Sequence, residues 1–370
     1  MLRSNAQRLL APGFWLLTPL LELLESSYAG MIKSFKRLTA VFADSACCHL
    51  INFINWRLPD RTNSPAELAS YMARCESLTR QEFYSKEPIK GLHIEPAFLS
   101  WSSPVESGFP ENDTAGARVF LSRQGWSAPA VLFLHALMSA SDFGYQRIAR
   151  RFNQMGWTAV LVHLPFHYTR VPPGYLNGGL ALTSELIRNA ETIRQAVMEI
   201  RQLLELLRTQ GADRFGLIAT SYGGWIGSLV LSLEEDFEFA ALLQPIVDIE
   251  DAIWNSPAAV AIRSHLRRHL IGPGISRQHA HLSCPFEQKS LVDPRRIHLL
   301  AGEFDQIVPV KTLRRFAETW DVQNFEIVPQ GHFGYVAMNR VLRQLGLVLV
   351  LVVVLVLESG VAPDLRCMLV

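Results

Sequence analysis

The chain has 370 residues, of which 49% are hydrophobic, 19% charged and 10% aromatic, and its 35 basic and 34 acidic side chains give a formal net charge of +1. This apolar content excludes an intrinsically disordered chain, and a net charge near zero without a long basic block argues against a nucleic-acid partner. The length fits either two domains of roughly 150 residues or one large α/β domain with an appendage.

The first residues of the chain combine a basic start with an apolar stretch. Arg3 and Arg8 precede an apolar run from Leu9 to Leu21, which has the general pattern of a secretory signal peptide. Two prolines and a glycine interrupt this run, glutamates follow it directly, and it has no clear A-x-A cleavage site. We therefore expect an amphipathic surface or membrane-contacting segment in preference to a cleaved signal peptide.

Residues 1–88 are predicted to form a helical N-terminal extension. Their apolar spacing is irregular to helical, and two segments have the sequence of a helix start. Ser64-Pro65-Ala66-Glu67 reads as a capping box with proline at the first helical position, and the segment from Thr79 to Glu82 reads as a second capping box. No residue of this extension points to a particular chemistry.

From Gly91 onward the pattern changes to short apolar runs separated by helical stretches. Continuous apolar runs of this kind are typical of parallel strands that are covered by helices on both faces. The sequence therefore predicts an α/β domain over residues 89–345, built on a mostly parallel sheet. The expected strands are 92–99, 117–123, 131–135, 159–162, 215–219, 239–243, 297–301 and 324–328, and a long helix is expected over 184–210.

Two further segments complete the predicted organisation. A long stretch rich in histidine and arginine separates the strands expected at 239–243 and 297–301, and a structureless loop of that length is uncommon in a compact domain. We predict an inserted helical cap at about 246–294. Residues 346–370 are predicted to form an apolar C-terminal tail. The apolar run that leads into it, from Leu345 to Leu357, would span only about 20 Å as a helix and is too short to cross a bilayer. This run fits a last core helix, a membrane-touching or partner-binding tail, or a corrupted reading frame.

The five cysteines are Cys47, Cys48, Cys75, Cys284 and Cys367. They are few, odd in number and without a C-x-x-C pair, so they support neither a disulfide framework nor a thiolate zinc site. This pattern favours a reducing compartment. We expect a cytoplasmic protein, with membrane association as an open alternative.

The segment that points most directly to chemistry runs from Phe215 to Gly224. Ser221 lies between a predicted buried strand and a predicted helix, which is the setting of a nucleophile elbow. Because strand and helix nearly touch at such a turn, the positions two before and two after the serine must be small. Gly223 meets this requirement, and Ala219 is the next smallest residue in place of the usual glycine. Ser221 would then project from the turn, near amides at the positive end of the following helix.

This segment resembles the α/β-hydrolase superfamily, and the resemblance covers most of residues 91–345. The segment His135-Ala136-Leu137-Met138-Ser139 follows a predicted strand and looks like the family's H-G-x oxyanion loop, with Ala136 in place of the customary glycine. The resemblance implies that the backbone N–H groups of Leu137 and Tyr222 form an oxyanion hole. Residues 163–174, together with the long helix before the elbow, are similar to a branch of the superfamily that includes the animal α/β-hydrolase domain-containing protein 18.

The resemblance also implies an acid and a base for Ser221. In this superfamily the nucleophile, the acid and the histidine follow one another along the chain, each at the end of a strand. The segment from Ala301 to Pro309 resembles the acid loop, with Asp305 as the acid. The segment from Val328 to Gly334 follows the last strand, with His332 as the base.

Alternatives remain open at several of these positions. Asp305 could instead cap the helix that begins near Pro309, in which case Asp248 or Glu303 would supply the acid. His332 could be a buried structural histidine, and Ser221 a small helix-start residue in an inactive relative. His135 is expected to hydrogen-bond within its loop rather than to react.

The remaining histidines form pairs that invite a metal-binding interpretation, namely His163 with His167, His265 with His269, and His279 with His281. The first pair brackets a proline in a loop, and no carboxylate-rich partner motif accompanies the pairs. We therefore expect no metal. Neither a Walker loop nor a dinucleotide fingerprint is present in the sequence, so no cofactor is expected.

Taken together, the sequence predicts a serine hydrolase, an esterase or lipase-like enzyme that cleaves a carboxylic ester, thioester or amide through a Ser221-His332-Asp305 catalytic triad. The expected partner is a small-molecule acyl ester. The apolar terminal segments favour a lipid-like ester and peripheral membrane contact. The alternatives are a non-catalytic binding protein of the same fold, favoured by Ala136 and Ala219, and an acyltransferase that uses the same triad.

Overall fold

The computed structural model describes residues 14–139 and 141–346, and it describes side chains from Met31 onward. The predictions for residues 1–13, for Cys367 and for almost all of the tail 346–370 lie outside the described residues.

A nine-stranded sheet forms the centre of the molecule, with the strand order β1-β2-β3-β5-β4-β6-β7-β8-β9. The first three strands are antiparallel to their neighbours, and β4 to β9 are parallel to one another. The strands are β1 (Lys90–Glu95), β2 (Phe98–Ser102), β3 (Thr114–Phe120), β4 (Ala130–Leu134), β5 (Thr158–His163), β6 (Phe215–Thr220), β7 (Phe237–Leu243), β8 (Ile297–Gly302) and β9 (Asn324–Val328).

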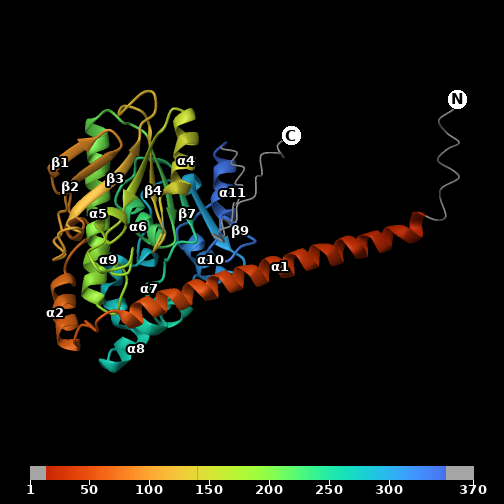
Figure 1. The fold of residues 1–370 in the computed structure, drawn as a ribbon, viewed down its shortest axis with the longest axis horizontal. Coiled ribbons are helices and arrows are strands. Elements are labelled where there is room, and N and C mark those ends of the chain that lie inside the picture. The colour runs from red at the N-terminus through yellow and green to blue at the C-terminus, as the bar shows by residue number, and fades with distance from the viewer. Residues whose placement is uncertain (1–13, 140, 347–370) are drawn as a thin grey trace, which may run out of the picture.

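Helices cover both faces of this sheet (Figure 1). One face packs against α5 (Leu186–Thr209), α6 (Tyr222–Leu231) and α10 (Val310–Thr319), whose buried side chains share one hydrophobic cluster with the sheet. The other face packs against α4 (Phe143–Gln154) and α11 (Val336–Gln344) through a second cluster. The predicted mostly parallel α/β sheet with helices on both faces is confirmed.

One predicted strand is wrong in its extent. Residues 92–99 were expected to form a single strand, but β1 and β2 divide this segment and pair antiparallel with each other. The chain reverses at Pro96 and Ala97, which are a two-residue connection of the length that joins hairpin strands.

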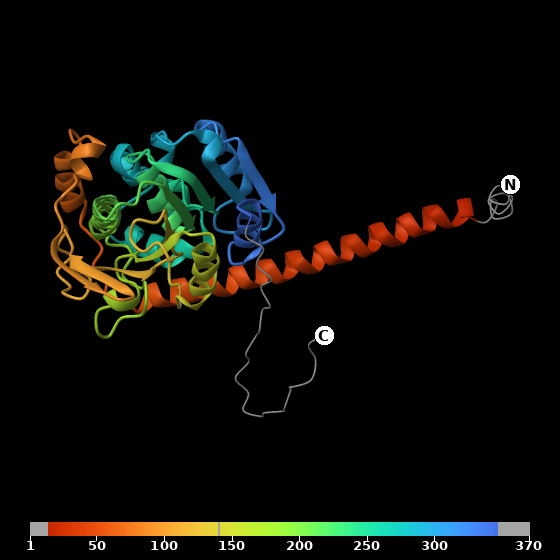
Figure 2. The same cartoon turned by 90° about the horizontal axis from the view of Figure 1, so that it is seen from above.

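From Phe14 onward, the N-terminal part of the chain is mainly helical, as predicted. It contains α1 (Phe14–Arg57), α2 (Pro65–Cys75) and α3 (Arg80–Phe83). Both predicted capping boxes are present, because Ser64 and Thr79 exchange hydrogen bonds with the glutamates three residues later. In both views α1 extends far beyond the rest of the molecule, and its C-terminal part lies against the body (Figures 1 and 2).

A helical insertion separates β7 from β8, at the place where a cap was predicted. It contains α7 (Ile249–Trp254), α8 (Val260–Arg268), α9 (Ala280–Ser283) and short 3-10 turns. The last turns of α1 pack against α8 and against the 3-10 turn Pro257–Ala259. The N-terminal helix and the insertion therefore meet at one end of the molecule, while the division of the chain at residues 88 and 345 stays a prediction.

Candidate active site

Ser221 lies in the sharp turn between β6 and α6. Its backbone has φ 54° and ψ −112°, a conformation that a non-glycine residue adopts only when the surrounding structure holds it there. Hydrogen bonds from its own N–H to the Leu243 carbonyl and from the Trp225 N–H to its carbonyl hold this turn. Gly223 is required at the same place, because a Cβ there would lie 2.4 Å from the Leu134 carbonyl oxygen. The turn therefore has the geometry of the predicted nucleophile elbow.

The structure also explains why Ala219 is tolerated in place of glycine. Its methyl group faces Gly227, one turn further along α6, and a Cβ on Gly227 would lie only 2.8 Å from the Cβ of Ala219. The small residue Gly227 on the helix therefore leaves room for the methyl group of Ala219 where β6 and α6 lie close together. Ala219 is fully buried and consistent with the close packing of this turn.

The three residues predicted to form a triad lie in one hydrogen-bonded series. The Ser221 Oγ is 2.7 Å from Nε2 of His332, and Nδ1 of His332 is 2.8 Å from Oδ2 of Asp305. Because a carboxylate can only accept a hydrogen bond, the Nδ1–H group of His332 donates to Asp305. The other ring nitrogen, Nε2, can then accept the hydroxyl proton of Ser221. All three side chains are buried, with relative exposures of 6%, 6% and 8% for Ser221, His332 and Asp305.

The two oxygens of Asp305 have separate partners. Oδ1 accepts hydrogen bonds from the backbone N–H groups of Ile307 and Val308, each at 2.8 Å, and this contact fixes the carboxylate in its loop. The other oxygen, Oδ2, accepts from His332 and, at 2.8 Å, from the Gln244 side chain. One carboxylate therefore both holds its own loop and contacts His332, and it does not cap α10, whose N-cap residue Pro309 receives no side-chain hydrogen bond.

Neither alternative acid reaches His332. Asp248 accepts a hydrogen bond from the Asp251 N–H at 2.9 Å and caps α7. Glu303 points to the outside of the molecule, where its carboxylate pairs with Lys33 of α1 at 2.6 Å. Of the acids considered in the sequence, Asp305 is the one that the structure brings to the histidine.

Burial and charge shift the pKa of His332 in opposite directions. Burial of the imidazole lowers its pKa, whereas the charge and hydrogen bond of Asp305 and the charge of Asp44 raise it. The charges prevail, and the pKa of His332 lies above its ordinary value of 6.5. The site therefore stabilises the imidazolium that would form when the histidine takes up a proton.

Two residues of this site were not found from the sequence. Asp44 of α1 is fully buried, and its carboxylate accepts from the backbone N–H groups of His332 at 2.9 Å, of Phe333 at 3.2 Å and of Gln306 at 3.0 Å. Gln244, which follows β7, donates to Asp305 and to the Gly331 carbonyl. Because Gln244 follows a predicted strand, the sequence gave a weak indication that it lies at this edge of the sheet. No pattern in the sequence pointed to Asp44.

The loop after β4, predicted to supply an oxyanion donor, is held by two neutral histidines. His135 accepts from the Leu164 N–H and lies 2.9 Å from the Ala136 carbonyl oxygen, while His167 accepts from the Met138 N–H. Burial lowers the pKa of His135 well below 6.5 and lowers that of His167 to about 4, so both rings stay neutral. His135 hydrogen-bonds within this region, as expected, and the loop has a defined shape without glycine at position 136.

Several of the other paired histidines have polar partners of their own. The His163 ring contacts the Thr169 hydroxyl, and both His265 and His269 lie within 3.2 Å of one oxygen of Asp60. Within residues 31–139 and 141–346, no group of three or more His, Cys, Asp and Glu side chains has an arrangement that could hold a metal ion.

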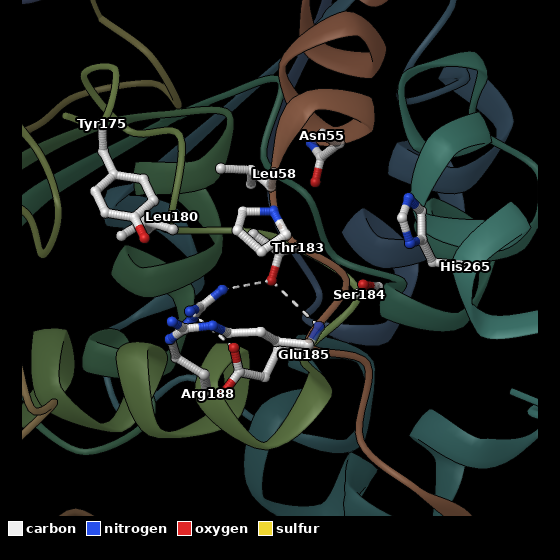
Figure 3. Close-up of a pocket in the computed structure, with 11 residues that line it drawn as sticks. Asn55, Leu58, Tyr175, Leu180, Thr183, Ser184, Glu185, Arg188 and His265 are labelled. Atoms are coloured by element: carbon white, nitrogen blue, oxygen red, sulfur yellow. Dashed lines mark hydrogen bonds and ion pairs between the residues drawn. The ribbon is translucent and has the colours of Figure 1, made fainter.

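A small pocket, with a cavity volume of about 20 Å³, lies between the C-terminal end of α1, the loop after β5 and α8 (Figure 3). Its polar lining groups bind one another: the Thr183 hydroxyl accepts from Arg188 at 2.8 Å and from the Glu185 N–H at 3.2 Å. None of the three triad residues lines this pocket.

Comparison with known proteins identifies two sequence relatives. Two uncharacterized proteins of Mycobacterium tuberculosis, from strains CDC 1551 / Oshkosh and H37Rv, are each 28% identical over 205 residues. The match covers 55% of this chain and 48% of each relative, so the chain spans about half the length of the curated relatives it matches. No family model matches the chain.

Solved structures resemble most of this chain in fold. Acetyl xylan esterase 1 from Thermoanaerobacterium sp. JW/SL YS485 superposes with a TM-score of 0.51 at 16% identity, over 77% of this chain and 94% of that protein. The acetyl xylan esterase from Paenibacillus sp. R4 gives 0.53 at 13% identity, over 79% and 96%. These matches give no support to the narrower branch of α/β-hydrolase domain-containing protein 18. With its central sheet, its helical layers and the turn at Ser221, the chain has the α/β-hydrolase fold.

Proposed function

We propose that this protein is a serine hydrolase that cleaves a carboxylic ester through an acyl-enzyme intermediate. The observation that carries the proposal is the series of short contacts from the Ser221 hydroxyl through His332 to Asp305. A serine hydroxyl is a weak nucleophile, so it needs a base within hydrogen-bonding reach and an acid that orients this base. In this series His332 is the base within reach of Ser221, and Asp305 is the acid that orients His332.

In the proposed reaction Ser221 attacks the ester carbonyl while His332 takes its proton. The imidazolium, stabilised by Asp305, then delivers this proton to the leaving alcohol, and the acyl group stays on the serine oxygen. Water attacks the acyl-enzyme in a second step that uses His332 in the same way, and it releases the carboxylic acid. Backbone N–H groups of Tyr222 and Leu137 are the proposed donors to the oxyanion, each worth roughly 3 to 4 kcal/mol in the transition state.

The proposed substrate is a small acyl ester. Two of the superposed proteins are acetyl xylan esterases, which supports ester chemistry on this fold. A lipid-like acyl chain fits the apolar character of the N-terminal helix, in which Met31–Arg57 is long and apolar enough, by length and composition, to cross a membrane. We also propose that the chain belongs to the branch of α/β-hydrolase domain-containing protein 18. A cytoplasmic location and a cap at about 246–294 are part of the same proposal.

A fluorophosphonate probe tests the nucleophile directly. The wild-type chain is expected to be labelled, and Ser221→Ala to be unlabelled while folding normally. On short p-nitrophenyl esters, Ser221→Ala and His332→Ala are each expected to lower kcat by about 10⁴-fold or more. Ser228→Ala is a matched control, because this buried serine donates to the Gly224 carbonyl and lies outside the triad.

The result separates the three readings of the site. Equal labelling of the wild type and Ser221→Ala would remove Ser221 as the nucleophile. A folded chain with neither labelling nor turnover would show a binding protein of this fold. Labelling with faster acyl transfer to an added alcohol than to water would show an acyltransferase.

A further inference from the structure

Large apolar side chains are exposed along one face of α1. They recur mostly at intervals of three or four residues, so they line a single face of the helix. Each exposes between 49% and 75% of its surface. We call this set the outer stripe; it consists of Met31, Phe35, Leu38, Phe42, Leu50, Phe53 and Trp56.

From Asp44 onward, the side of α1 away from the outer stripe is buried against the body, whereas residues 31–39 are exposed all around the helix. Asp44 and Asn52 lie on the buried side, the first bound to the His332 loop and the second accepting from the Ala261 N–H at 2.8 Å. At 3.6 residues per turn, Phe42 and Phe53 point about 160° to 180° away from Asp44. The outer stripe is therefore the side of α1 that the body leaves uncovered, on a helix that also projects beyond the body (Figures 1 and 2).

A cationic groove adjoins the C-terminal end of the outer stripe. It lies between Trp56 and one face of α8, and α8 contributes Val260, Ser264 and three arginines to its lining. Those arginines are Arg263, Arg267 and Arg268. The lining contains no acidic residue, and Asp60 lies 3.8 Å from Arg268 at its border. The groove thus places three positive charges beside an exposed tryptophan and an exposed valine.

We propose that the outer stripe and this cationic groove together form a docking surface for a lipid bilayer that contains anionic lipids. An amphipathic helix with Phe, Leu and Trp on its free face lies in the plane of the interface and buries that face about 5 to 10 Å deep. Arginines at the same level bind lipid phosphates, because anionic headgroups attract basic side chains within about a Debye length. The surface uses no residue of the proposed catalytic series, so this inference stands independently of the proposed reaction.

The contacts of the inner face favour an interfacial helix over a membrane-spanning one. The carboxylate of Asp44 holds three backbone N–H groups of the body, and Lys33 pairs with Glu303. A spanning orientation would break these contacts and place a carboxylate in hydrocarbon, which is costly. An interfacial orientation keeps the inner face on the body and the outer stripe in the bilayer.

Flotation with lipid vesicles tests the surface on the full chain. We expect binding to vesicles of phosphatidylcholine and phosphatidylglycerol, weaker binding to phosphatidylcholine alone, and loss of the difference at high salt. Ser221→Ala should bind as the wild type does, so failure of the proposed reaction and failure of docking give different results.

Two double variants with matched controls locate the surface. Phe35→Gln/Phe42→Gln should lower affinity for both vesicle types, whereas Arg267→Gln/Arg268→Gln should lower affinity for the anionic vesicles alone by about tenfold or more. The controls lie on α4, which packs against β3 and β5: Phe143→Gln, another exposed phenylalanine, and Arg150→Gln/Arg151→Gln, another exposed pair. Both controls should bind as the wild type does.

Three outcomes would overturn the proposal. The first is equal binding, or no binding, of the wild type to the two vesicle types. The second is a dimer in solution that Phe35→Gln/Phe42→Gln dissolves, because a second copy would then cover the stripe. The third is a membrane fraction that resists alkaline carbonate, because the helix would then cross the bilayer.

Discussion

Asp44 connects the N-terminal helix to the two loops that carry Asp305 and His332. Its carboxylate is buried beside Gly331, where a Cβ would lie 2.6 Å from its Oδ1, so the loop must lack a side chain at this position. Through its backbone contacts Asp44 fixes the position of His332, and through its charge it raises the pKa of that imidazole. We therefore regard Asp44 as a positioning residue.

The substitution Asp44→Asn tests this role through a pH profile. His332 must be neutral to accept the serine proton, so kcat/KM is expected to fall as the pH drops through its raised pKa, above 6.5. Removing the Asp44 charge lowers that pKa, so the acid limb of the profile should move to lower pH. Glu303→Gln is the control, since it breaks another contact of α1, the pair with Lys33, and should leave the acid limb in place. An unmoved acid limb in folded Asp44→Asn would contradict the assignment.

The contact between Ala219 and Gly227 gives a second prediction. Gly227→Ala places a methyl group 2.8 Å from the Cβ of Ala219 and should lower the free energy of unfolding by about 1 to 3 kcal/mol. Adding Ala219→Gly removes the opposing methyl group, so the double variant should regain much of the loss. Denaturant unfolding of the two single variants and the double variant measures this coupling. Additive losses would show that the two residues do not compensate for each other.

At the scale of elements, short-range patterns predicted most of the fold. The buried strands appear as continuous apolar runs, and the capping boxes at Ser64 and Thr79 mark helix starts because their hydrogen bonds span only three residues. Ser221, Asp305 and His332 follow the ends of β6, β8 and β9. They come together because the carboxyl ends of parallel strands lie along one edge of the sheet. Asp44 was not predicted because its contact with His332 joins residues 288 positions apart, and no local pattern encodes such a pair.

A buried ion pair joins the loop after β5 to the long helix α5. Arg170 and Glu199 are both buried, and their contacts measure 2.6 Å and 2.8 Å. The guanidinium also donates to the carbonyls of His163 and Asn112. This pair anchors the segment whose His167 supports the loop after β4, so it acts on the candidate site through an intermediate element.

Breaking this pair should be costly for stability. Glu199→Gln leaves a buried guanidinium without its counter-charge and is expected to lower the free energy of unfolding by about 3 to 5 kcal/mol. Glu238→Gln is the matched control, because its partner Arg214 is half exposed and such surface pairs contribute about 0 to 1 kcal/mol. Chemical denaturation of both variants gives the comparison. Equal losses of unfolding free energy in the two variants would show that the buried Arg170–Glu199 pair is no more important for stability than the exposed pair.

At the scale of the whole molecule, α1 has two faces with separate tasks. Its inner face binds the His332 loop and the helical insertion, while the outer stripe stays uncovered. Docking at a bilayer through the outer stripe would hold the carboxyl edge of the sheet near the lipid surface. This arrangement would bring the proposed serine hydrolase close to lipid-like esters without requiring the inner contacts to open.

Two truncations distinguish the parts of α1. Among the residues with described side chains, the contacts of α1 with the body begin at Lys33 and include Asp44 and Asn52. A chain that begins at Met31 keeps all of these contacts, so its thermal stability and its turnover of soluble esters should match those of the full chain. A chain that begins at Leu58 loses the buried carboxylate that orients the His332 loop, and its turnover should fall by at least tenfold together with its stability. Equal activity of the two truncated chains would show that α1 serves docking alone.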